Sequence, residues 1–319
     1  MCGQCGFICE GIGPIGHLLS VAEGAMVHRG PDSTGFALYG EQRNDDSIIV
    51  RARVDKEVDA YQAVVAISNQ VAGVGGKLSR EPEVNEGVKG SGNFLRALVN
   101  FSGPPALLLE AIESVEGTYV HSMGRRLEII KDVGTADQVA AQHRIDDFVG
   151  THGLAHSRLA TESTVDVELS HPFWARPFLD VAIVHNGQLT NYYKMRRLMS
   201  QRGFKFLTGN DSELIAVYIA EQLSQGKSLE DALSKSIDDV DGVFTYLLAT
   251  ETAIGCAADR LAIKPLVVTT VEGTLAFATE EQALRRVFDV ELVTDYVREG
   301  SAVVWESELV GESVDTVNV

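Results

Sequence analysis

The sequence predicts an α+β protein in which a sheet-rich core is flanked by a few helices and carries an inserted lobe. Short β-rich runs with turn residues between them fill the chain after Gly242. Two helical stretches, at about 191–202 and 211–225, are each followed by a glycine, which is a usual stop signal of a helix. Residues 41–150 differ from both regions in their pattern of strands, helices and a Gly-rich loop, and we interpret them as an inserted α+β lobe.

The segments in chain order support this assignment. The first forty residues predict a strand at 6–9, a helix from about His17 to Met26 and a strand at 36–40. The lobe shows two strand patterns, two helix patterns and a Gly-rich loop, which are 47–54 and 125–134, 61–72 and 104–117, and 85–93. Apolar strands that end in polar loops follow at 153–161 and 180–187, and an S-x-x-D pattern starts a helix at Ser228. The remaining β-rich runs are 244–250, 252–258, 265–270, 274–279, 291–297 and 301–306.

Composition excludes several classes of function. The formal net charge of -18 argues against a nucleic-acid-binding face and against an electrostatic membrane anchor. No stretch approaches the roughly 18 apolar residues of a membrane span, and the first residues lack the layout of a signal peptide. We therefore expect a cytoplasmic protein. Three of the four cysteines lie within the first ten residues, which is no disulfide framework for a chain of 319 residues.

Cys2 is the most informative residue in the sequence. Once the initiator methionine is removed, it carries both a thiol and a free α-amine. A cysteine thiol, with a pKa near about 8.5, needs a base before it attacks at neutral pH. An α-amine, with a pKa of roughly 7.7–8.0, suits that task. One residue would then supply both the nucleophile and the general base.

A second candidate lies in Val-His-Asn-Gly, residues 184–187, at the expected end of an apolar strand. The side-chain amide of Asn186 and the backbone N–H of Gly187 could donate to the oxyanion of a tetrahedral intermediate. Glycine would allow the backbone to approach closely. The alternative is a type I′ hairpin turn, for which Asn-Gly is the strongest signal. The local pattern leaves both interpretations open.

Three further motifs also have a functional and a structural interpretation. Arg158 follows an apolar strand, where its guanidinium could grip a carboxylate in bidentate fashion, or it is a solvated surface arginine. Asp211 opens a helix, and it either caps that helix or pairs with the ammonium group of a substrate. His-Arg-Gly-Pro-Asp-Ser, at 28–33, is also typical of a surface turn, because Pro-Asp favours one.

Together and in this order, the motifs resemble the glutaminase domain of class II glutamine amidotransferases. The resemblance covers about two thirds of the chain. It rests on Met-Cys-Gly at the start, His-Arg-Gly-Pro-Asp-Ser at 28–33, His-Ser-Arg at 156–158, His-Asn-Gly at 185–187, Asn-Asp-Ser-Glu at 210–213, Asp-Arg-Leu-Ala-Ile-Lys-Pro-Leu at 259–266 and Ala-Thr-Glu at 278–280.

The resemblance implies an N-terminal nucleophile hydrolase fold over residues 2–319, a four-layer αββα sandwich of two antiparallel sheets with the inserted lobe at about 41–150. It implies that Cys2 is nucleophile and base, and that Asn186 and Gly187 form the oxyanion hole. The implied substrate-binding residues are Arg158 for the glutamine α-carboxylate, Asp211 for its α-amine, Arg29 in support of the nucleophile's surroundings and Thr161 beside the carboxylate. Attack on the side-chain amide would release ammonia and leave a γ-glutamyl thioester, and water would hydrolyse the thioester to glutamate.

Within the family, the sequence looks most like the stand-alone amidotransferase subunit of glutamate synthase-like enzymes, including methylamine–glutamate N-methyltransferase. This similarity lies in the lobe and in residues 151–163, 170–173 and 184–198. The sequence contains neither a P-loop nor a G-x-G-x-x-G turn. We therefore expect a hetero-oligomer in which a separate subunit uses the ammonia. The resemblance implies that this partner is glutamate synthase-like and could carry a flavin or iron–sulfur cluster, and no cofactor is expected in this chain.

Other classes of function compete with this one. Cys2, Cys5 and Cys9 have a C-x2-C-x3-C spacing that could ligate an iron–sulfur cluster or zinc, although no fourth ligand lies nearby, and we expect no metal site. A non-catalytic regulatory subunit that senses glutamine would keep Arg158 and Asp211 but would not need Cys2. A peptidase or amidase of the same fold would not need a pair of residues suited to a free amino acid.

Overall fold

Two antiparallel sheets packed face to face form the centre of the protein, for which a computed structural model describes residues 2–41, 47–160 and 165–306. The strands of the first sheet are, in spatial order, β16 (Asp295–Tyr296), β14 (Val267–Val271), β15 (Thr274–Ala278), β1 (Gly3–Gly13), β9 (Gly150–Arg158), β2 (Ser33–Tyr39) and β8 (Leu127–Val133). The strands of the second are β10 (Phe173–Trp174), β11 (Ala182–Leu189), β12 (Gly242–Ala249), β13 (Ala253–Ala258) and β17 (Ala302–Glu306).

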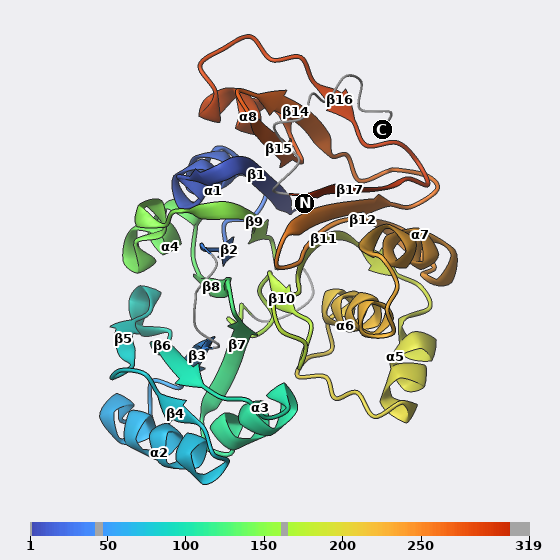
Figure 1. Cartoon of the computed structure of the whole chain (residues 1–319). Coiled ribbons are helices and arrows are strands. Elements are labelled where there is room, and N and C mark those ends of the chain that lie inside the picture. Colours follow the sequence, from blue (N-terminus) through green and yellow to red (C-terminus); the bar gives the residue numbers. More distant parts are fainter. Residues whose placement is uncertain (1, 42–46, 161–164, 307–319) are drawn as a thin grey trace.

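Helices cover the outer face of each sheet (Figure 1). The helices on the first sheet are α1 (Ile15–Ala25), α4 (Ala136–His143) and α8 (Glu281–Val287), with the short η2 (Ile145–Asp147) beside α1. Those on the second are α5 (Tyr192–Gln201), α6 (Asp211–Ser224) and α7 (Leu229–Asp239). The order helix, sheet, sheet, helix confirms the expected four-layer αββα sandwich.

Alternating side chains build the core between the two sheets. Because successive side chains of a strand point to opposite faces, Ile8 of β1 faces the second sheet while Phe7 packs under α1. From the other side Val184 of β11 and Leu247 of β12 join the same central core. The two sheets therefore hold the start of β1 and the middle of β11 in fixed relative positions.

A third sheet forms the inserted lobe, at the lower left of Figure 1. Its strands are β4 (Lys77–Leu78), β6 (Asn93–Asn100), β3 (Ser47–Val54) and β7 (Thr118–Gly124), with β5 (Glu83–Glu86) also paired to β6. The helices of the lobe are α2 (Ala60–Gly73), α3 (Pro105–Glu113) and the short η1 (Val88–Gly90).

The third sheet ends at Gly124, well before the expected limit near residue 150. The next strand, β8, pairs with β2 in the first sheet. The carboxylate of Asp180 fixes this crossing, because it accepts hydrogen bonds from the backbone N–H groups of Arg125, Arg126 and Leu127, each at 2.9 Å. Strand pairing between distant residues therefore sets the boundary.

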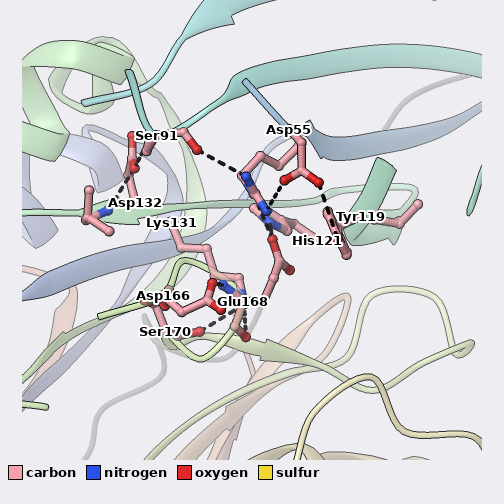
Figure 2. A network of polar contacts seen from close by, with 12 residues as sticks. Asp55, Ser91, Tyr119, His121, Lys131, Asp132, Asp166, Glu168 and Ser170 are labelled. Carbon is pink, nitrogen blue, oxygen red and sulfur yellow. Dashed lines mark hydrogen bonds and ion pairs between the residues drawn. The ribbon is translucent and has the colours of Figure 1, made fainter. Parts of the chain in front are cut away.

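Buried ion pairs attach the lobe to the segment that follows β9 (Figure 2). Glu168 accepts from Arg53 Nε of β3 at 2.9 Å and lies 3.2 Å from His121 Nε2 of β7. Lys131 of β8 donates to the carbonyl oxygens of Glu168 and Ser170 at 3.3 and 2.9 Å. Burial alone would raise the pKa of Glu168, but His121, Lys131 and Arg53 outweigh burial and hold that pKa well below its usual range. Removing one partner of a buried ion pair leaves the other charge uncompensated, which costs about 3–5 kcal/mol. These contacts therefore stabilise the position of the 166–170 turn against the lobe.

The local patterns located most of the elements but missed several. The helices expected at 191–202, 211–225 and 61–72 are confirmed within a few residues. β6, β7, α4 and α8 were not expected; α4 is short and only weakly apolar, although a capping box of Thr135 and Gln138 starts it. Among the helices in the described part of the chain, none is long and apolar enough to cross a membrane.

Candidate active site

Cys2 stands at the start of β1, where the pairing of two strands brings it beside Arg158. Gly3 pairs with Ser157 in the β1–β9 ladder, so the next residue on each strand is Cys2 on one and Arg158 on the other. Arg158 also pairs with Ser33 of β2. The thiol-bearing residue and the arginine expected to hold a carboxylate therefore share one end of the first sheet, although they are far apart in sequence.

The His-Arg-Gly-Pro-Asp-Ser loop fixes the backbone around Arg158. Asp32 N donates to the carbonyl of Arg158 at 3.2 Å, and Asp32 Oδ2 accepts from Ala160 N at 2.8 Å. A Cβ atom on Gly30 would lie 2.3 Å from the backbone carbon of Ser157, so only glycine fits there. The loop is therefore more than a surface turn, because it positions the end of β9.

Arg29 lies in the same loop and forms an ion pair with Glu280. His28 Nε2 lies 3.2 Å from the same carboxylate oxygen. Glu280 directly follows Thr279, whose hydroxyl accepts from Gln4 N at 2.9 Å. Arg29 is thus linked to the start of β1 through Glu280 and Thr279.

Asn186 lies inside β11, not at its end. The pairs Asn186–Thr245 and Gly187–Phe244 continue the ladder with β12 as far as Leu189. The alternative of a two-residue hairpin turn at Asn-Gly is therefore wrong. Asn186 Nδ2 is 3.4 Å from the backbone carbonyl oxygen of Cys2, so the side-chain amide of the second sheet contacts the residue that precedes β1 in the first.

Gly187 is exposed, and its backbone N–H lies on the edge of β11 opposite β12. Its partner Phe244 exchanges hydrogen bonds with Asp259 instead, since Asp259 N donates to Phe244 O and Phe244 N donates to Asp259 Oδ2. In an antiparallel ladder, the backbone N–H and C=O groups of one residue pair point toward each other, and those of the next pair point away from each other. Gly187 and Phe244 form a pair of the second kind. The N–H of Gly187 therefore faces away from β12, as does that of Leu189, which donates to Asp211 Oδ2 at 2.9 Å.

Only glycine can occupy position 187. Its φ of +151° is disfavoured for other residues, and a Cβ atom would lie 2.1 Å from the carbonyl oxygen of Val243. The backbone conformation directly after Asn186 therefore requires glycine.

Asp211 is the first residue of α6, but it is not the residue that caps this helix. Asn210 is the cap, because its side chain accepts from Ser212 N at 2.8 Å. Asp211 instead faces β11, where it accepts from Leu189 N and lies 3.6 Å from His185 Nδ1. Burial would raise the pKa of Asp211, but His185 and the backbone N–H groups lower it below its usual range. The carboxylate is therefore charged at neutral pH beside β11.

Three buried histidines lie between Asn186 and Asp211. His156 Nε2 is 3.2 Å from Asn186 Oδ1, and the rings of His156 and His171 lie with centroids 4.0 Å apart. Ser212 Oγ lies 2.7 Å from His171 Nε2 and 2.9 Å from His185 Nδ1. Burial lowers the pKa of His156 to about 3 and that of His171 well below its usual range. Both rings are therefore neutral at neutral pH.

The other N-terminal cysteines have separate partners. Cys5 Sγ is 3.1 Å from Glu23 Oε2 under α1, and Cys9 lies 3.7 Å from the hydroxyl of Thr274. Burial, followed by the charge of Glu23, raises the pKa of the Cys5 thiol. Within the described residues, no three histidine, cysteine or acidic side chains are grouped so that they could hold a metal ion.

The structure brings Cys2, Asn186, Gly187 and Arg158 to one region and places Asp211 on the neighbouring edge of β11, whereas Thr161 lies outside the described residues. The local patterns missed His156 and assigned no role to Thr279, which also accepts from Asn186 Nδ2 at 3.3 Å. His156 belongs to the His-Ser-Arg motif and Thr279 to the Ala-Thr-Glu motif. Membership of these motifs is the signal that could have identified both residues.

Comparison with known proteins identifies similar sequences. A family model described as a glutamine amidotransferase domain matches residues 156–286. A protein of Methanothermobacter thermautotrophicus named as a glutamine amidotransferase is 34% identical, over 96% of this chain and 100% of its own length. The glutamine amidotransferase-like protein GlxB of Rhizobium meliloti is 32% identical, over 92% of this chain and 90% of its own length.

Solved structures share the fold. The glutamine phosphoribosylpyrophosphate amidotransferase from B. subtilis aligns over 96% of this chain, with a TM-score of 0.60 and 17% sequence identity. A structure described as the allosteric regulatory enzyme of purine biosynthesis aligns with a TM-score of 0.62 at 17% identity. The alignment covers 48% and 47% of those two chains, so this protein spans about half their length.

Proposed function

The chain belongs to the class II glutamine amidotransferases, and we propose that it is a glutaminase whose nucleophile is Cys2. The observation that carries this proposal is the approach of the Asn186 amide to Cys2 at the same sheet end as Arg158. A donor that can polarise an amide, a thiol and a cation that can bind a carboxylate then come from residues at one end of the first sheet. Glutamine is the substrate that needs all three.

The α-amine and the thiol of Cys2 act together once Met1 is removed. The amine takes the thiol proton, and the thiolate attacks the side-chain carbonyl carbon of glutamine. The oxyanion that forms accepts hydrogen bonds from Asn186 Nδ2 and the N–H of Gly187. Collapse of the intermediate breaks the C–N bond, and the departing nitrogen takes the proton from the amine. Water then attacks the γ-glutamyl thioester, which releases glutamate and restores the thiol.

Arg158 and Asp211 bind the end of glutamine that does not react. The guanidinium of Arg158 matches the α-carboxylate. The charged carboxylate of Asp211, held toward β11 by Leu189 N, matches the α-ammonium group. A substrate held by both charged groups leaves its side-chain amide available to Cys2.

Arg158→Ala and Asp211→Ala are expected to raise the KM for glutamine more than they lower kcat. Both residues make interactions that are alike in the ground state and the transition state, so their loss mainly weakens uniform binding. Some loss of kcat is expected from misorientation of the amide. The measurement is glutamate release as a function of glutamine concentration. Exposed Arg197→Ala, on α5, is a matched control for the loss of a positive charge. A fall in kcat at unchanged KM in both site variants would contradict these roles.

A glutamine sensor without catalysis is the main alternative. Such a protein would bind glutamine but release no ammonia, so equilibrium binding without turnover would support it. A metal module on the N-terminal cysteines is a further alternative, tested by metal analysis of the purified protein. The separate partners of Cys5 and Cys9 favour the glutaminase over that module.

We further propose that the ammonia passes to a separate, glutamate synthase-like subunit that carries the flavin or iron–sulfur cofactor. The sequence resemblance supports this proposal. Such a subunit would avoid wasting glutamine if it hydrolysed it only when the acceptor is bound to the partner.

The isolated chain is expected to hydrolyse glutamine slowly, and the partner is expected to raise the rate roughly 5–150-fold. That range corresponds to a coupling free energy of about 1–3 kcal/mol between two sites. The measurement compares glutamate release by the isolated chain with release by the complex purified from its native host. Full activity of the isolated chain, together with its purification as a single monomeric species, would contradict an obligate partner.

A further inference from the structure

The side-chain amide of Asn186 could face Cys2 with either its NH2 group or its oxygen. The two groups have nearly the same shape, so their hydrogen-bond partners determine the orientation. The end near Cys2 lies 3.4 Å from a backbone carbonyl oxygen, which can only accept a hydrogen bond. That end must therefore be the NH2 group. The opposite end, Oδ1, is an acceptor and needs a donor, and His156 Nε2 lies 3.2 Å from it.

His156 is held as a donor at that nitrogen. Its ring is fully buried and neutral at neutral pH, because burial lowers its pKa to about 3. A neutral imidazole carries one N–H. Since Asn186 Oδ1 cannot donate, the proton lies on Nε2. Nδ1, which no hydrogen bond reaches within the described residues, holds the lone pair.

Neighbouring side chains fix the plane of the His156 ring. The ring of His171 packs against it, and His171 is in turn bonded to Ser212 in the first turn of α6. Lys131 holds the carbonyl of Ser170, the residue before His171. The ring of His156 therefore has little freedom to move away from Asn186.

We propose that His156 is a positioning residue for the oxyanion hole, which keeps the NH2 group of Asn186 directed toward Cys2. This inference rests on the proposed glutaminase function. Without the Nε2 donor, the Oδ1 atom would be buried and unpaired. The amide would then no longer be held at its Oδ1 end, so its NH2 group could move away from the reacting carbonyl, where negative charge develops.

The test compares His156→Leu, which removes the donor, with His156→Gln, whose side-chain NH2 can take the place of Nε2. Leucine is expected to lower kcat by up to about 100-fold, the scale of a misplaced catalytic group, with the KM for glutamine nearly unchanged. Glutamine at position 156 is expected to recover most of the lost kcat. Alkylation of Cys2 by iodoacetamide should proceed at the original rate in both variants, because it needs no oxyanion hole. His156→Asn, polar but too short to reach Asn186, replaces the leucine variant if that variant does not fold.

A double-mutant cycle separates positioning from a general structural role. If His156 acts through Asn186, then adding His156→Leu to Asn186→Ala lowers kcat no further. A full, additive loss in that background would overturn the proposal, as would a glutamine variant no better than the leucine variant. An Asn186→Ala protein that keeps its full kcat would instead refute the proposed oxyanion hole itself. The two failures are therefore distinguishable.

Discussion

Replacement of Cys2 by alanine is expected to abolish glutamine hydrolysis, with kcat lowered by about 10⁴-fold or more, as when other enzymes lose a catalytic nucleophile. Asn186 and Gly187 would remain, but no atom would be left to form the thioester. The fold should persist, because Cys2 is only partly buried and lies outside β1. The measurement is glutamate release, with thermal unfolding recorded for the same preparation.

Cys9→Ala is the matched control, because Cys9 lies on β1, close in sequence to Cys2, but packs against Thr274. It should retain activity close to that of the unmodified protein. Mass spectrometry after treatment with a glutamine-like diazoketone should show a single adduct, on a peptide that begins at Cys2. The Cys2→Ala protein should show none. An adduct on Cys5 or Cys9 would contradict the assignment.

The parts of the site that local chemistry specifies could be predicted from the sequence. A cysteine that directly follows the initiator methionine indicates a nucleophile with its own base, because the thiol and the α-amine belong to one residue. The apolar runs predicted the strands on which Arg158 and Asn186 lie, because a buried strand has a recognisable composition. The four layers came from the resemblance of the motifs, and the structure confirms them.

The parts that depend on pairing between distant segments could not be predicted. Asn-Gly is locally a hairpin signal, yet β12 extends the ladder past it and makes it part of a strand. Asp211 has the position of a helix cap, but its neighbour Asn210 takes that role and frees its carboxylate to face β11. β8 resembles the lobe in composition, but its partner is β2. The role proposed for His156 depends on its contact with Asn186, thirty residues later in the chain.

Asn186→Ala is expected to lower kcat on the order of 10²–10³-fold, the usual cost of removing one oxyanion donor. The KM for glutamine should change little, because the amide is proposed to act on charge that develops only in the transition state. A specific effect on chemistry is expected, since Asn186 Nδ2 contacts Cys2 and Thr279, while Arg158 and Asp211 are proposed to hold the other end of the substrate. The measurement is steady-state glutamate release over a range of glutamine concentrations.

Gln188→Ala is the matched control, because Gln188 lies two residues further along β11 with an exposed side chain. It removes an amide of similar chemistry from the same strand and should leave kcat unchanged. The alanine at 186 also leaves the buried donor of His156 unpaired, which costs about 1–3 kcal/mol of stability, so assays must run well below the unfolding temperature. A rise in KM with kcat unchanged would place Asn186 in substrate binding, and Gly187 would then be the sole donor to the oxyanion. Equal losses in the Asn186 and Gln188 variants would show that β11 was merely disturbed.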